Sequence, residues 1–163
     1  MANTFERVTF FCRDLEASLK FYCDGLGLCV VEQKTLEGAA AGGLLQLPPC
    51  RIRIALLAAG PESPAFLGLF EITGTPLDAI VATRGRPTYG QSALVISTDR
   101  FDAIAEALDR AGVQFLTPPL RYPKRVASER SPAGLYREMI FYDPDGFLLS
   151  VMQIDPLPDD DAA

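Results

Sequence analysis

The chain has 163 residues, enough for one domain or two small fused modules that bury a substantial core. With 48% hydrophobic and 22% charged residues, it has the composition of an ordinary globular protein. The net charge of -6 arises partly from the tail at 159–161, and no basic stripe is visible, which argues against a nucleic-acid partner.

Neither a leader sequence nor a membrane span is apparent. Residues 1–11 lack a basic stretch followed by a long apolar run, and no apolar run approaches membrane-spanning length. We therefore expect a cytoplasmic protein with no membrane partner. The four cysteines show no C-x-x-C spacing and lie in apolar patterns. Buried or inert thiols are thus favoured over a disulfide or a cysteine-only metal site.

The first half of the chain predicts the order strand, helix, strand, strand, strand. Asp14 stands where a helix cap is expected, and Gly25 and Gly27 end the helical pattern. Residues 36–49 are rich in Gly and Ala and predict a short helix or a mobile flap. The expected strands are 5–12, 28–35, 51–59 and 65–74.

The same pattern starts again beyond residue 90. Thr98 or Asp99 is expected to cap the second helix, and Gly112 to stop it. A final hairpin turns at Asp143–Gly146, where the proline presets φ and the glycine supplies a positive φ. The remaining predicted elements are strands at 91–97 and 113–117, a loop at 118–135 with four prolines, and hairpin strands within 137–153.

The two halves form an internal repeat. Leu15 and Phe101 hold equivalent helix positions about 86 residues apart, and each half has the order βαβββ. This predicts an α+β fold in which helices cover one face of each sheet and the other face is free for a ligand. The predicted parts are a first module at 1–74, a connector at 75–90, a second module at 91–153 and a disordered acidic tail at 154–163.

Two segments resemble the vicinal oxygen chelate superfamily. They are D-L-E-x-S-L-x-F-Y-x-x-x-L-G-L from Asp14 to Leu28 and D-P-D-G at 143–146, and with the repeat the resemblance covers residues 5–153. The superfamily includes glyoxalase I, extradiol dioxygenases, methylmalonyl-CoA epimerase, and fosfomycin and bleomycin resistance proteins. The resemblance implies two tandem βαβββ modules that form a half-barrel sheet around a central cavity, and a homodimer.

Members of this superfamily commonly place one metal ligand on the first strand and one on the last strand of each module. Carried over to this chain, these positions fall on Arg7 and Glu71 in the first module, and on Ala93 and Ser150 in the second. The chain has no histidine. Glu71, even with Gln91 in a shifted register, gives too few donors for Zn, Ni, Fe or Mn. We therefore expect neither metal nor cofactor, and a metal-dependent lyase or dioxygenase only if this register is misjudged.

Several functions remain open on this basis. One is a metal-free binding protein, similar to the bleomycin resistance branch, which holds a small organic molecule, in particular an aromatic one. Another is a metal-independent isomerase or lyase in which Arg7 binds an oxyanion and Glu71 transfers a proton. In a third, Arg7 and Glu71 form an ion pair that plugs the vacated site of a scaffold protein.

Alternation along the strands predicts which side chains face the ligand. Arg137 and Glu138, at the start of the seventh strand, are expected to serve strand pairing rather than chemistry. The predicted ligand-binding residues are Thr9, Phe11, Leu69, Ala93, Val95, Leu148, Ser150 and Met152.

Overall fold

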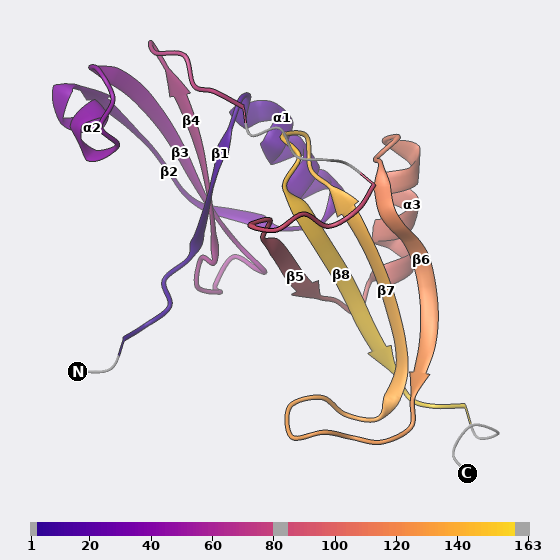
Figure 1. Cartoon of the computed structure of the whole chain (residues 1–163). Helices are drawn as coiled ribbons and strands as arrows, with labels where there is room; N and C mark the ends of the chain where they lie inside the picture. Colours follow the sequence, from indigo (N-terminus) through magenta and orange to yellow (C-terminus); the bar gives the residue numbers. More distant parts are fainter. Residues whose placement is uncertain (1–2, 80–84, 159–163) are drawn as a thin grey trace. The chain divides into compact units, whose positions relative to one another are not determined.

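The computed structural model describes residues 3–79 and 85–158 and divides the chain into two compact units, Met1–Val81 and Ala82–Ala163. Each unit has a four-stranded mixed sheet with a helix against it, in the order βαβββ (Figure 1). The predicted α+β fold of two tandem modules is therefore confirmed. The predicted connector, 75–90, straddles the unit boundary, and its residues 80–84, like the tail residues 159–163, lie outside the described part. No helix among the described residues is long and apolar enough to span a membrane.

The first unit is built on a sheet with strand order β1-β4-β3-β2, in which β1 runs parallel to β4 and the other pairs are antiparallel. Its main helix, α1, continues as a π-helical segment, η1. The short helix expected within residues 36–49 is α2. The elements are β1 (Val8–Cys12), α1 (Leu15–Leu19), η1 (Lys20–Gly25), β2 (Cys29–Gly38), α2 (Ala39–Leu44), β3 (Cys50–Ala58) and β4 (Leu67–Thr73).

Local sequence signals explain where the helices of this unit begin and turn. The side chain of Asp14 accepts a hydrogen bond from the backbone N–H of Ala17 at 3.0 Å, which confirms the predicted cap. At Gly42 in α2, a Cβ atom would lie 2.1 Å from the carbonyl oxygen of Pro48. Only glycine permits this close approach, so the glycine at this position serves tight packing.

The second unit repeats the arrangement with strand order β5-β8-β7-β6, β5 running parallel to β8. The hairpin turn forms as predicted: the side chain of Asp143 accepts hydrogen bonds from the N–H groups of Asp145 and Phe147, and Gly146 has a φ of 95°. The elements are β5 (Ala93–Ser97), α3 (Phe101–Arg110), β6 (Phe115–Lys124), β7 (Gly134–Tyr142) and β8 (Leu148–Asp155).

Two local predictions for the second unit were wrong. Half of the predicted loop 118–135 is strand: residues 118–124 belong to β6 and 134–135 to β7. This is possible because β6 is an edge strand and its prolines at 118 and 119 fall where the ladder shifts register. The cap position of α3 is Arg100, not Thr98 or Asp99; the Thr98 hydroxyl instead accepts the N–H of Arg100 at 3.0 Å.

Both helices are tied to their sheets by the same device. The first backbone N–H of α1, at Leu15, donates to a side-chain oxygen of Glu71 at 3.1 Å. The first N–H of α3, at Phe101, donates to the side-chain oxygen of Gln153 at 3.2 Å. Glu71 lies on β4 and Gln153 on β8, the strands that pair in parallel with the first strand of each unit. The two side chains are therefore equivalent, and both satisfy a helix N–H that has no partner inside the helix.

An arginine completes the device in each unit. Arg53 is the cross-strand neighbour of Glu71, donates to it at 3.1 Å, and also pairs with Glu16, the second residue of α1. Arg137 is the cross-strand neighbour of Gln153, stacks on the Phe101 ring, and pairs with Asp102, the second residue of α3. Each arginine thus joins the sheet to the first turn of its helix, where an acidic side chain also suits the helix dipole.

The repeated device predicts how substitutions at Glu71 affect stability. Glu71→Leu removes the acceptor for the Leu15 N–H and for the Arg53 guanidinium. Because both donors are then underpaired, we expect the free energy of unfolding to fall by about 2 to 3 kcal/mol. Glu71→Gln keeps an acceptor oxygen, as Gln153 does in the second unit, and should cost about 1 kcal/mol or less. Urea denaturation measures both values, and equal losses would contradict this role for Glu71.

Candidate functional site

Each sheet has one face covered by its main helix and one face turned away from it, which we call the open face. Neighbouring side chains along a strand alternate between the faces, and paired residues on adjacent strands share a face. In the first unit, Glu71 marks the helix face because it bonds to α1. Thr9 and Phe11 lie on the open face, where the Phe11 ring packs edge-on against Phe70 with centroids 6.1 Å apart.

Two of the predicted site residues therefore lie on the wrong face. Leu69 pairs with Phe10 and Glu71 with Cys12, and both pairs point toward α1. Leu69 is fully buried in the core there. The prediction failed because a shift of one residue in strand register moves a side chain to the opposite face, and the sequence does not fix the register of β4.

Arg7 and Glu71 do not meet either. Arg7 directly precedes Val8, whose ladder partner is Leu67, whereas the partner of Glu71 is Cys12 at the far end of β1. Five residue steps separate the two levels, about 16 Å along the strands at ~3.3 Å per residue. Glu71, which we expected to pair with Arg7, forms an ion pair with Arg53 instead.

Arg7 lies on the open face of the first unit, over a glycine. A Cβ atom built on Gly68 would lie 3.4 Å from the Cδ atom of Arg7 and 3.4 Å from the Leu56 side chain. Gly68 follows Leu67 on β4 as Ser150 follows Leu149 on β8, and the ladders make these positions equivalent. The second unit therefore has the hydroxyl of Ser150 at this position. The first unit has Gly68 there, which has no side chain and is covered by the aliphatic part of Arg7.

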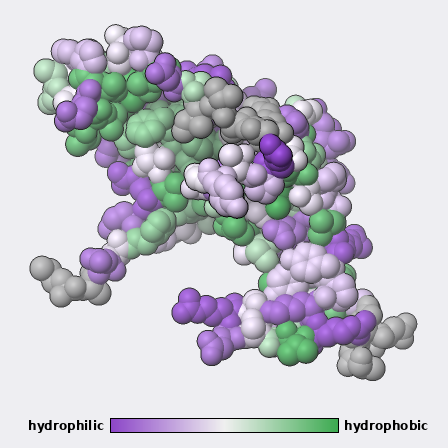
Figure 2. Space-filling view, viewed as in Figure 1, coloured by the Kyte–Doolittle hydropathy of each residue, from purple (hydrophilic) through white to green (hydrophobic). Residues whose placement is uncertain are grey.

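The β3 part of the open face of the first unit is apolar and partly covered by α2. Figure 2 shows apolar surface around α2 at one end of this unit. The predicted short helix thus packs as a cover on β3, and part of the open face is closed by the chain itself. The buried residues of this cluster are Ala41, Cys50, Ile52, Ile54 and Leu56.

The second unit brings the predicted residues of its sheet together on one face. Val95 pairs with Ser150, and Ala93 and Leu148 pair beside them on the same strands. Met152 lies two positions beyond Ser150 and shares its face. Val95 is 56% exposed, whereas Ser150 is only 4% exposed. The open face of this unit therefore combines accessible apolar groups with a buried hydroxyl.

A carboxylate that the sequence interpretation assigned to strand pairing lies at the centre of this face. Glu138 on β7 accepts a hydrogen bond from the Ser150 hydroxyl at 2.7 Å on one oxygen. Its other oxygen accepts the hydroxyl of Tyr122, on β6, at 3.1 Å. Glu138, Tyr122 and Ser150 thus form a polar network across three strands. Arg137 lies on the opposite face, where it stacks on Phe101 of α3.

The Tyr122 side chain is fixed by its ring as well as by its hydroxyl. It stacks on Tyr136 with ring centroids 5.4 Å apart and an interplanar angle of 23°. Burial, followed by the hydrogen bond to Glu138, raises the pKa of Tyr122 above its usual range. The phenol therefore stays protonated at neutral pH and remains a hydrogen-bond donor to the carboxylate.

A signal for Glu138 was present in the sequence. The turn at 143–146 pairs Tyr142 with Leu148, so alternation along β7 places Ile140 and Glu138 on the same face as Ser150. Counting back from the turn would have identified Glu138. No local motif indicates Tyr122 as a site residue, because Tyr122 lies in the segment that was expected to be a loop.

The described residues offer little for a metal ion. Across 3–79 and 85–158, no group of three or more His, Cys, Asp or Glu side chains is close enough to hold one. The superfamily ligand positions carry Arg7, Gly68, Ala93 and Ser150, which supply at most one weak hydroxyl donor. The donor set of these positions therefore does not fit a divalent metal.

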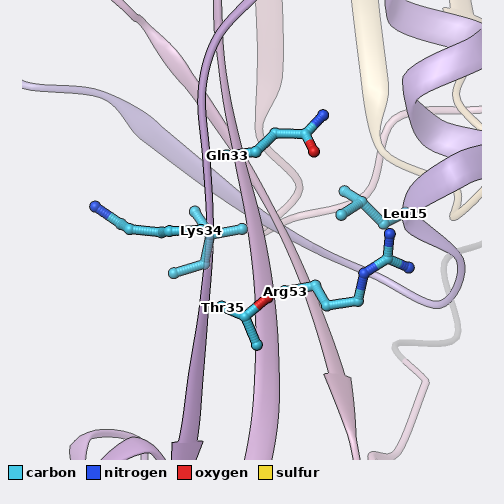
Figure 3. Close-up of a pocket in the computed structure, with 6 residues that line it drawn as sticks. Leu15, Gln33, Lys34, Thr35 and Arg53 are labelled. Atoms are coloured by element: carbon cyan, nitrogen blue, oxygen red, sulfur yellow. The ribbon is translucent and has the colours of Figure 1, made fainter.

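A small pocket of about 150 Å³ lies elsewhere in the first unit, between α1 and strands β2 and β3. Figure 3 shows Arg53 beside Leu15, and Lys34 extending away from them. Arg53 pairs with Glu16 and Glu71, so its guanidinium serves to hold α1 against the sheet. We therefore place the candidate site on the open faces.

Solved structures with a similar fold span most of the chain. A glyoxalase family protein from Bacillus cereus is 19% identical, with a TM-score of 0.68 and coverage of 92% of this chain and 93% of that one. Glyoxalase I from Leishmania major, described as trypanothione-dependent, is 16% identical, with a TM-score of 0.59 and coverage of 93% and 87%. The fosfomycin resistance protein FosX from Listeria monocytogenes, in complex with Mn(II) and sulfate, is 16% identical, with a TM-score of 0.51 and coverage of 99% and 98%.

Comparison with curated protein sequences finds no match. The family model described as Glyoxalase/Bleomycin resistance protein/Dioxygenase superfamily matches residues 4–151, nearly the whole of both βαβββ modules. The chain belongs to the glyoxalase/bleomycin resistance protein/dioxygenase superfamily.

Proposed function

We propose that this protein binds a small organic molecule on the open face of its second unit and does so without a metal ion. The observation that carries the proposal is the carboxylate of Glu138, held by the hydroxyls of Tyr122 and Ser150 on an otherwise apolar surface. Convergent polar groups among apolar side chains are the usual make-up of a small-molecule site. The accessible side chains of Val95 and Leu120 supply apolar contact beside the network.

The donors support the metal-free part of the proposal. FosX is a relative whose structure contains Mn(II), but this chain has no histidine. Ser150 replaces a carboxylate at the ligand position of the second unit, and Gly68 occupies the equivalent position in the first. A neutral serine hydroxyl is a poor ligand for the divalent metals that act in such sites.

An enzyme that works through Arg7 and Glu71 is not supported. Both oxygens of Glu71 have structural partners, the Leu15 N–H and Arg53. A base with both oxygens engaged on the helix face is poorly placed to take a proton from a ligand on the open face. Arg7 remains a candidate to bind a ligand oxygen on the open face of the first unit. The homodimer that the resemblance implies also stays a prediction.

Metal analysis tests the first half of the proposal. We expect the purified protein to contain far less than one equivalent of Zn, Ni, Fe or Mn per chain by elemental analysis. Treatment with EDTA should leave the melting temperature unchanged, because the described residues include no donor set for a metal. A stoichiometric metal whose removal lowers the melting temperature would overturn the metal-free site.

Ligand screening tests the second half. A set of mono- and bicyclic aromatic compounds should include members that bind saturably and shift backbone NMR signals of β5 and β8. Val95→Arg places a long charged side chain beside Ser150 and should weaken this binding at least ten-fold. Ala103→Arg, an equivalent change on the exposed side of α3, is the matched control and should leave binding unchanged. Equal effects of the two variants would contradict a site on the open face.

A further inference from the structure

We infer that the ligand is an organic cation, an amidine, guanidine or protonated amine on a flat apolar body, whose charged group is bound by Glu138. This inference rests on the proposed function and names the ligand class of the same site. Three observations support this ligand class: the charge balance around Glu138, the acceptor positions open on its carboxylate, and the neighbouring tyrosine ring.

Among the described residues of its unit, no cationic side chain neutralises the charge of Glu138. Its two hydrogen-bond partners, Tyr122 and Ser150, are neutral hydroxyls. Among the described residues of this unit, no ion pair involves Glu138, whereas Arg137 pairs with both Asp102 and Asp155. A ligand that covers the half-buried carboxylate without supplying positive charge would pay its full desolvation cost. A cationic ligand offsets that cost with a charge-assisted hydrogen bond.

The carboxylate has room for such a bond. An ionised carboxylate offers about four acceptor positions on its two oxygens. In Glu138 the Ser150 hydroxyl occupies one oxygen and the Tyr122 hydroxyl the other, one bond each. The described residues leave one position on each oxygen open, which suits the two parallel N–H groups of an amidinium or guanidinium.

The tyrosine ring next to the acid suits the flat part of the ligand. Tyr136 is 5% exposed and covers one face of the Tyr122 ring, while Tyr122 is 39% exposed. A planar group can therefore stack on Tyr122, and a positive charge near the ring gains cation–π attraction. Lys124, the like charge on this side, lies over Tyr136 and is held by Ser128 and Ser131 rather than by Glu138.

Three probes that share a biphenyl group and carry a positive, a neutral or a negative substituent test the inference. They are 4-phenylbenzamidine, its neutral amide 4-phenylbenzamide, and biphenyl-4-carboxylate, each titrated into the full-length protein by calorimetry or NMR. We expect the amidine to bind at least ten-fold more tightly than the amide, and the carboxylate more weakly than both. Glu138→Gln should lower amidine affinity about ten-fold and leave amide affinity nearly unchanged, since a bond to a charged group is stronger than a neutral one.

Controls keep the outcomes distinct. Glu106→Gln, the same charge change on the exposed side of α3, should alter none of the affinities, and an unchanged melting temperature of Glu138→Gln shows that the variant folds. Tyr122→Leu should weaken the binding of all three probes by removing the stacking surface. If the amide binds as tightly as the amidine and both need Tyr122, the inference fails while the proposed function stands. If no probe binds in a Tyr122-dependent way, both fail.

Discussion

The first backbone N–H of each module helix has to find a partner, and the sheet supplies it. Glu71 does so for α1 and Gln153 for α3, from equivalent positions near the ends of β4 and β8. An arginine on the neighbouring strand then joins each sheet to the first turn of its helix. This repeated link fixes which face of each sheet is covered by a helix and hence which face remains open, and every assignment of a site residue depends on that choice.

The link also decides between two acids. Glu71 looks like a site residue in the sequence because it is the acidic residue in a strand where related proteins carry a ligand. Its equivalent in the second unit is an amide, Gln153, so the shared task is to accept a hydrogen bond, which requires no charge. Glu138 has the opposite character: it lies on the open face, its partners are neutral hydroxyls, and no described residue of its unit forms an ion pair with it. The acid that we propose to bind the ligand therefore lies in the second unit.

The sequence was a good guide to the fold because its signals are local and repeated. Asp14 caps a helix and Asp143 to Gly146 makes a turn through contacts within a few residues, so both were readable directly. The site depends on register between strands distant in the sequence, where a shift of one residue exchanges the faces. Leu69 and Glu71 were misplaced for that reason, whereas Val95 and Ser150 were placed together because the turn at 143–146 anchors their sheet. Tyr122 was missed because prolines in an edge strand resemble a loop.

We assign a structural role to Glu71 and propose a binding role for Glu138, and side-chain carboxyl NMR observes both side chains at once. With ¹³C-labelled glutamate, titration with 4-phenylbenzamidine should move the carboxyl signal of Glu138 saturably and leave that of Glu71 in place. A saturable shift of the Glu71 signal, with Glu138 unmoved, would contradict the assignment of the two roles.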